Sequence, residues 1–424
     1  MRIRNATLPN GEVADVRIEG SRIEAVGDDL EPVPREGTID ASGLRLMPAA
    51  VDVHVHFREP GFTHKEDWAS GTASAAAGGV GTVVDQPNTE PATVTGDAFD
   101  NKVDRAEKAH VDYGINGGVS PDWEPDELLS RPLFALGEVF LADSTGEMGI
   151  EPELVRTALE RAAAADVPVT IHAEDDDEFD ESVRDRDDPA VWSDYRAPAA
   201  EISAVEATVD IADGIGADLH LAHASIPDAV DLAVDAGLTV EASPHHLLLS
   251  RDDLEDLGTY GRMNPPLRDE QHRSDLWDRL LDGTIDMVAT DHAPHTAEEK
   301  DASIWEAPSG VPGVETMVPL LVAAAERDEI SYDRVAEVTA RRPAERFGLS
   351  SKGRVEPGFD ADIALFDPES RPIEAEQLHT KCDWTPFAGW DGVFPVLTLV
   401  RGRVAFEGGD VGRAIGENVR SADS

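Results

Sequence analysis

The side chains best suited to chemistry begin with His54 and His56, which lie in a short apolar segment with one valine between them. In a β-strand, residues i and i+2 point to the same face, so the two imidazoles would converge at the C-terminal end of the strand. Neutral imidazole is a common Zn²⁺ ligand, and two of them make half of a metal site. Two polar residues on a half-exposed strand are the simpler interpretation, and this pair alone does not exclude it.

Further ligand-type side chains lie at the ends of four later segments with strand-like patterns: Glu138, His172, His223 and Asp291. Each of them alone could be a structural residue, such as a buried histidine with a hydrogen-bond partner. Four strand ends that each carry such a residue are not expected by accident. Nitrogen and carboxylate ligands without a thiolate suit Zn²⁺ with open positions, or a bridged pair of ions. Zinc would lower the pKa of a bound water to roughly 7, and Asp291 could exchange the proton of that water.

The middle of the chain predicts the elements that must position these residues, because short apolar runs alternate there with helical patterns. Helical patterns cover, for example, residues 65–77 and 152–165. The strand candidates span residues 46–57, 81–86, 113–119, 134–141, 168–174, 218–224, 238–249 and 285–291. Eight such units predict an α/β fold of the (β/α)8 TIM-like barrel type, whose active site lies at the C-terminal ends of the strands. A doubly wound parallel sheet is the alternative.

Both ends of the chain differ from this middle, because residues 1–46, 361–366 and 398–406 alternate like short strands. We therefore expect a small composite β-sandwich domain formed by residues 1–46 and 350–424, with residues 47–349 forming the catalytic barrel. Residues 175–188 are strongly acidic, and we interpret them as a solvated insertion rather than as a mobile cover of the site.

The charge balance is extreme, with 86 acidic and 36 basic residues and a formal net charge of −50. Apolar periodicity runs through the whole chain, so this acidity does not indicate disorder. Self-repulsion of this size destabilises a compact state unless salt screens it, which predicts a protein of a very salty cytosol, as in halophiles. Such a surface repels nucleic acid.

The sequence also shows no features of a membrane-spanning or secreted protein. No run approaches the ~18 apolar residues of a membrane span, and the N-terminus lacks the apolar region of a signal peptide. The single cysteine, Cys382, has no partner for an internal disulfide. We therefore expect a cytoplasmic protein with a small-molecule substrate, no nucleic-acid partner and no membrane association. The oligomeric state stays open, with a homodimer as one option.

These motifs resemble those of the cyclic amidohydrolases, a branch of the metal-dependent amidohydrolase superfamily that includes dihydroorotases, allantoinases and hydantoinases. The resemblance covers most of the chain and is strongest over residues 44–91 and 288–316. It implies two Zn²⁺ ions per subunit, bridged by Glu138. It also implies that metal-bound hydroxide attacks the amide carbonyl while Asp291 shuttles the proton. The ligands that it implies are His54, His56, Glu138, His172, His223 and Asp291.

Glu138 departs from the family pattern, because many relatives have a carboxylated lysine at this position. This chain has no lysine between residues 108 and 300, so a carbamate bridge is excluded here. Glu138 can still bridge two ions through its carboxylate, although its shorter reach leaves the number of metals open. Asp143 is the alternative bridging ligand, since some bacterial relatives use an aspartate a few residues later, but we favour Glu138.

Residues beside the expected metal site indicate which cyclic amide is the substrate. Arg58 follows the histidine pair directly, and a guanidinium there can bind a carboxylate with two parallel hydrogen bonds. Allantoinase-like enzymes usually have asparagine at this position, and a surface ion pair with Glu59 is the simpler interpretation of Arg58. Asn88 resembles the asparagine that dihydroorotases direct at the substrate carboxylate, although its Pro-Asn-Thr context is also ordinary turn chemistry.

Two later residues resemble the dihydroorotase pattern as well. His295 lies in a segment like the dihydroorotase signature, where it would contact the substrate carboxylate, whereas allantoinases tend to have cysteine there. Asn264 lies in a segment like the loop whose asparagine holds the ring amide. The resemblance therefore implies the ring closure of N-carbamoyl-L-aspartate to L-dihydroorotate with loss of water. The rivals are an allantoinase or hydantoinase, and a non-catalytic scaffold of the same fold, against which the retained ligand set argues.

Overall fold

In the computed structural model, which describes residues 1–141 and 148–421, each of the eight expected strand segments overlaps a parallel β-strand. The strands are β6 (Ala50–Val55), β7 (Val80–Asp85), β8 (Asp112–Ile115), β9 (Leu136–Phe140), β10 (Val169–His172), β11 (Leu219–Leu221), β12 (Thr239–Ala242) and β13 (Met287–Val288). They form one sheet of β6 to β8 and another of β9 to β13. Single bridges join Gly117 to Leu136 and Val55 to His292, so the two sheets close into a barrel. The barrel prediction is confirmed, and the doubly wound alternative is wrong.

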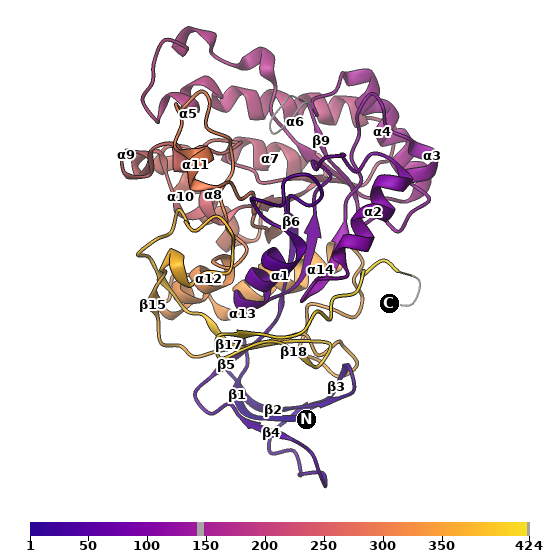
Figure 1. Cartoon of the computed structure of the whole chain (residues 1–424), viewed down its shortest axis with the longest axis vertical. Coiled ribbons are helices and arrows are strands. Elements are labelled where there is room, and N and C mark those ends of the chain that lie inside the picture. Colours follow the sequence, from indigo (N-terminus) through magenta and orange to yellow (C-terminus); the bar gives the residue numbers. More distant parts are fainter. Residues whose placement is uncertain (142–147, 422–424) are drawn as a thin grey trace.

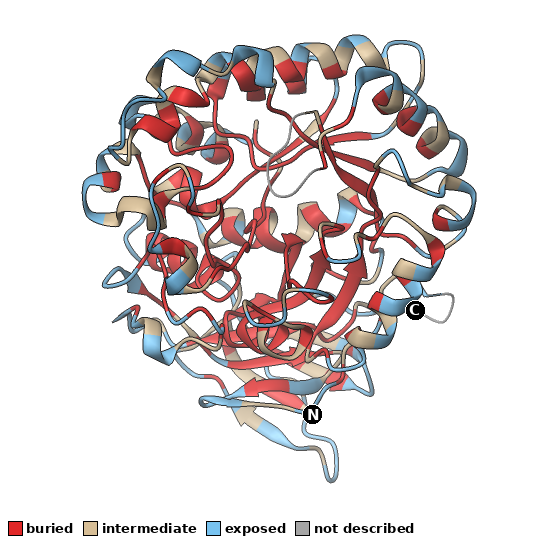
Figure 2. Ribbon diagram, turned by 45° about the horizontal axis from the view of Figure 1, so that its top comes forward, coloured by how far each residue is buried: buried red, intermediate tan, exposed pale blue. Residues whose placement is uncertain are grey.

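Helices connect the strands and cover the outside of the barrel, with buried inner faces and exposed outer faces (Figure 1, Figure 2). The helix expected at residues 152–165 has those bounds, whereas the one expected from Lys65 begins at Trp68, because the side chain of Asp67 caps its first backbone N–H groups.

No helix among the described residues is long and apolar enough to cross a membrane. The α-helices are α1 (Trp68–Ala77), α2 (Gly96–Ala106), α3 (Pro125–Leu128), α4 (Pro152–Ala165), α5 (Val191–Tyr195), α6 (Pro198–Ala212), α7 (Pro227–Asp235), α8 (Pro244–Leu248), α9 (Leu254–Leu257), α10 (Glu270–Asp282), α11 (Ala297–Lys300), α12 (Met317–Glu326), α13 (Tyr332–Ala336) and α14 (Arg342–Arg346).

A nine-stranded sheet combines both ends of the chain. In order of pairing its strands are β19 (Asp410–Val411), β18 (Arg403–Glu407), β17 (Pro395–Val400), β14 (Ile363–Phe366), β5 (Arg45–Pro48), β1 (Arg2–Thr7), β2 (Val13–Glu19) and β3 (Arg22–Gly27), with β4 (Thr38–Asp40) beside β1. In Figure 1 the layer of β5, β17 and β18 lies between the barrel and the layer of β1, β2 and β4. The strand pairing makes the two layers of this small sandwich parts of one sheet, and Ile18, Leu46 and Leu399 share one buried apolar cluster.

Part of the C-terminal segment leaves this sheet and packs against the barrel. β15 (Arg371–Pro372) and β16 (Asp391–Gly392) pair with each other, outside the nine-stranded sheet. Trp384, which lies between them in the chain, shares an apolar cluster with Leu249 of the barrel. Its indole N–H donates to the carbonyl oxygen of His295 at 2.8 Å. The C-terminal segment thus supports the loops at the C-terminal end of the barrel as well as the sheet.

Candidate active site

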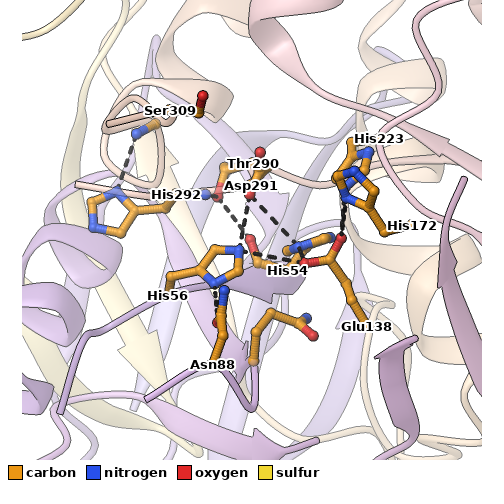
Figure 3. Close-up of polar contacts among 12 residues, drawn as sticks. His54, His56, Asn88, Glu138, His172, His223, Thr290, Asp291, His292 and Ser309 are labelled. Carbon is orange, nitrogen blue, oxygen red and sulfur yellow. Dashed lines mark hydrogen bonds and ion pairs between the residues drawn. The ribbon is translucent and has the colours of Figure 1, made fainter. Parts of the chain in front are cut away.

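The structure brings together all six residues that were expected to bind metal, at the C-terminal ends of the barrel strands (Figure 3). Their positions follow from the strands, because a side chain at or just beyond the end of a barrel strand faces the mouth of the barrel. None of the six is more than 6% exposed. They are His54 in β6, Glu138 in β9, His172 at the end of β10, and His56, His223 and Asp291 just beyond β6, β11 and β13.

Glu138 lies at the centre of this cluster, with one carboxylate oxygen toward each half of it. Its Oε1 is 2.7 Å from Nε2 of His223 and 3.0 Å from Nδ1 of His172. Its Oε2 is 3.2 Å from Nε2 of His54 and 3.7 Å from Nε2 of His56. This is the arrangement that a carboxylate needs in order to bridge two metal ions. Asp143, the alternative ligand, lies outside the described residues.

Two groups of three ligand atoms could each hold an ion. One group consists of His54, His56 and Asp291, and the other of His54, Glu138 and His223, with ligand atoms no more than 4.8 Å apart within each group. Oδ1 of Asp291 is 3.0 Å from Nε2 of His56 and 3.6 Å from Nε2 of His54. Imidazole nitrogens and carboxylate oxygens that converge in this way fit a cation between them, and a donor set without thiolate suits Zn²⁺.

The far side of three of these histidines is held by a hydrogen-bond acceptor. A carboxylate or amide oxygen can only accept, so the ring nitrogen beside it carries a proton, and in the neutral ring the other nitrogen points its lone pair into the cluster. The contacts are His54 Nδ1 to Glu241 Oε1 at 2.7 Å, His56 Nδ1 to Asn88 Oδ1 at 2.7 Å, and His172 Nε2 to Glu174 Oε2 at 2.8 Å.

Glu241 and Glu174 were not identified as site residues by the sequence analysis. Glu241 also accepts hydrogen bonds from Nε2 of His220 at 3.1 Å and from the backbone N–H of His223 at 3.2 Å. Glu174 is itself held by two hydrogen bonds from Arg196, of 2.9 and 2.8 Å. The only sequence signal was an acid in or just beyond a strand that is otherwise apolar, which costs free energy unless the acid is paired.

Neighbouring carboxylates favour the protonated form of two histidines in the metal-free cluster. Burial would lower the pKa of His172, but the carboxylates of Glu138 and Glu174 raise it to about 9. Burial also opposes the charge of His54, yet Glu138 and Glu241 raise its pKa well above the usual value. A metal ion that binds here must therefore displace protons.

The backbone at the site adopts conformations that non-glycine residues rarely occupy. His223, Asp291 and Arg58 have φ angles of 32°, 45° and 61°. Gly137, just before Glu138, has φ of +135°, and a Cβ there would lie 2.4 Å from the carbonyl oxygen of Thr170. Strain of this kind is typical of functional sites, where the surrounding structure must hold it in place.

A small cavity adjoins the cluster and is lined by, among others, Arg58, Asn264 and Ser309. Arg58 is 3% exposed and forms no ion pair among the described residues; its guanidinium contacts Nε2 of His295 at 3.2 Å and the carbonyl oxygen of Pro294 at 3.3 Å. The surface-pair interpretation of Arg58 is thus wrong, and Glu59 pairs instead with Lys108 at 2.9 Å. Burial lowers the pKa of Arg58 to about 10, which leaves it charged at neutral pH.

Asn88 and His295 do not line this cavity. Asn88 uses its oxygen to hold His56, and its Nδ2 is buried without a hydrogen-bond partner among the described residues. His295 lies behind Arg58, and burial and the charge of Arg58 lower its pKa to about 3. His295 is therefore a neutral imidazole that packs against the guanidinium.

A sequence model of the amidohydrolase family matches residues 45–405 of this chain. The chain belongs to the amidohydrolase family. Members of this family are hydrolases, and the cluster at the barrel mouth lies where an amidohydrolase site is expected.

Three individual amidohydrolases can be compared with this chain directly. The dihydroorotase of Halobacterium salinarum is 57% identical over 421 residues, which is 99% of both chains. The allantoinase of Rubrobacter xylanophilus is 34% identical and covers 96% of this chain and 94% of its own. Among solved structures, the L-hydantoinase from Arthrobacter aurescens matches with a TM-score of 0.94 and 28% identity over 98% of each chain. The amidohydrolase fold is thus shared with all three, and the dihydroorotase shares by far the most sequence.

Proposed function

We propose that this chain catalyses the reversible ring closure of N-carbamoyl-L-aspartate to L-dihydroorotate with loss of water. The 57% identity to a dihydroorotase over the full chain supports this reaction above those of allantoinase and hydantoinase. The observation in the structure that carries the proposal is Arg58, a buried guanidinium in the cavity wall without an ion-pair partner among the described residues. A buried unpaired charge costs free energy, which a carboxylate of the substrate would recover.

We further propose that two Zn²⁺ ions bind between these side chains. His54, His56 and Asp291 would hold one ion, His172 and His223 the other, and Glu138 would bridge them. When bound, such ions lower the pKa of a water ligand and polarise a carbonyl oxygen. The side chains of the chain itself supply orientation, protection from bulk water and proton transfer.

Asp291 is the proton carrier in this proposal. Burial would raise the pKa of its carboxyl, but the neighbouring imidazoles hold that pKa well below the usual range, so the group is an ionised carboxylate at neutral pH. In ring opening, Asp291 takes a proton from the attacking water and passes it to the ring nitrogen that leaves. Ring closure runs through the same steps in reverse.

The remaining residues orient the substrate. Arg58 binds the carboxylate, so that the reacting carbonyl lies beside the cluster. His295 supports Arg58 from behind. Asn88 holds His56 in the tautomer that points Nε2 inward. Asn264 lines the cavity and contacts the ring.

The proposed reaction is tested by a substrate panel in multimolar KCl. We expect turnover of carbamoyl aspartate and dihydroorotate, little with allantoin or hydantoin, loss of activity after treatment with a chelator, and recovery on addition of Zn²⁺. A preference for either neutral ring would exclude the proposed reaction, and full activity in the chelated protein would exclude the metal.

A further inference from the structure

One side chain of the segment between β10 and α6 contacts Asn264 in the cavity wall. Trp192 lies in α5 and is 6% exposed. Its indole N–H is 2.9 Å from Oδ1 of Asn264 and 3.2 Å from the carbonyl oxygen of Met263. The sequence predicts a solvated insertion over residues 175–188. Trp192, just beyond it, contacts a residue of the proposed substrate cavity directly.

This contact determines which way the amide of Asn264 is turned. An indole N–H can only donate, so the atom that faces it must be the amide oxygen rather than the nitrogen. Oγ of Ser309 lies 3.1 Å from the same oxygen and 3.2 Å from Nε of Arg262, which is also only a donor. Since Ser309 accepts from Arg262, its own proton is available for Asn264. Two donors thus converge on one side of the amide.

Both donors are held by their neighbours. The guanidinium of Arg262 lies 3.7 Å from the centre of the Trp192 ring, a cation–π contact that fixes the indole plane. Nζ of Lys300 is 2.9 Å from the carbonyl oxygen of Pro308 and 3.2 Å from that of Gly310, and these two contacts clamp the loop that carries Ser309. Buried contacts of this kind are screened by salt less than surface ion pairs are, which matters in so acidic a chain.

We propose that Trp192 is a positioning residue for ligand recognition. Together with Ser309 it holds the amide oxygen of Asn264, which fixes how this side chain is presented to a ligand in the cavity. The inference rests on the proposed function, in which Asn264 contacts the ring of dihydroorotate. Trp192 acts through Asn264 and does not touch the substrate.

The test compares two tryptophans of the same aromatic cluster. Trp192→Phe removes the N–H and keeps a ring beside Arg262. Trp305→Phe is the matched control, because the Trp305 ring centroid is 5.8 Å from that of Trp192 but its N–H donates to the carbonyl oxygen of Arg186 at 2.7 Å. We expect Trp192→Phe to raise KM for dihydroorotate roughly 3- to 10-fold, the effect of one lost hydrogen bond, with kcat and metal content little changed. Trp305→Phe should leave KM unchanged.

A double-mutant cycle distinguishes positioning from general loosening of the fold. In the Asn264→Ala background, Trp192→Phe should add no further increase in KM, because the side chain through which it acts is gone. Ser309→Ala removes the second donor and should behave in the same way, which keeps the test available if Trp192→Phe folds poorly. An equal increase in KM with and without Asn264, or an effect of Trp305→Phe as large as that of Trp192→Phe, overturns the inference. Wild-type protein without activity on dihydroorotate would instead overturn the proposed function.

Discussion

Arg58 shows at the scale of one residue how burial gives a side chain a functional meaning. Many arginines of this chain lie at the surface in ion pairs, such as Arg131 with Asp100 at 2.8 Å, and such pairs contribute little to stability. Arg58 is instead buried beside a neutral histidine, with no ion-pair partner among the described residues. A guanidinium in this environment favours the binding of an anion.

Substitution of Arg58 tests that interpretation. Arg58→Ala should raise KM for dihydroorotate roughly 10- to 100-fold, because a charge-assisted pair with the substrate carboxylate is lost. Metal content, measured by atomic absorption, should not change. Arg105→Ala removes a half-exposed arginine of α2 and is the matched control. Loss of metal in Arg58→Ala would show that the residue is structural.

Asp291 is tested by a change that keeps its shape. Asp291→Asn should lower kcat by at least about 100-fold, because an amide cannot accept the proton that a carboxylate carries. Single-turnover kinetics would separate this loss of chemistry from any change in substrate binding. Appreciable residual turnover would remove Asp291 as the proton carrier.

The metal-free protein should lose stability as the pH rises. The pKa of His172 is raised from its ordinary 6.5 to about 9 in the folded chain, so its contribution is fully present below pH 6.5. That contribution is lost as the pH rises through about 9, because both states are then neutral at this ring. The melting temperature of chelated protein should therefore fall between pH 6.5 and pH 9, while that of the metal-loaded protein should not. Parallel melting curves for the two forms would contradict this explanation.

At the scale of elements, β9 shows that the strand must be shaped before Glu138 can reach the cluster. Gly137 has a φ angle closed to most side chains, and it lies directly against the backbone of β10 at Thr170. The central ligand therefore depends on a residue that has no side chain of its own.

Gly137→Ala should displace Glu138. A Cβ 2.4 Å from a backbone oxygen cannot be accommodated without a shift of β9 or β10. We expect strongly reduced metal content and a loss of several kcal/mol of stability, measured by denaturant unfolding. Gly216→Ala is the control, because Gly216 also has a positive φ, of +76°, but nothing lies within 4 Å of its added Cβ. That change should cost about 1 kcal/mol and leave the metal in place. Equal metal content in the two variants would contradict this role for Gly137.

The whole molecule carries a net charge of −50, and many of its acids lie on exposed helix faces and loops, while the core of the barrel is apolar. Because unscreened repulsion among so many like charges opposes compaction, we expect the stability of the fold to depend on the salt around it.

The melting temperature should accordingly rise with salt. Between low ionic strength and multimolar KCl we expect an increase of roughly 10 °C or more, which corresponds to several kcal/mol for a chain of this size. Calorimetry at constant pH measures it, and a neutral osmolyte at matched osmolality is the control. A melting temperature independent of KCl would show that the surface charge does not limit stability.

The amino-acid sequence by itself determined the barrel and the positions of its ligand-type residues, because the alternation of apolar side chains is local and a strand end predicts where a side chain points. His54, Glu138, His172 and Asp291 could be placed in this way. The tertiary structure alone decided the roles that depend on contacts between distant segments. Glu241 holds His54 across 187 residues, and Trp192 orients Asn264 across 72. Such pairs leave no periodic signal, because the fold that brings them together also sets their distance and the direction of each hydrogen bond.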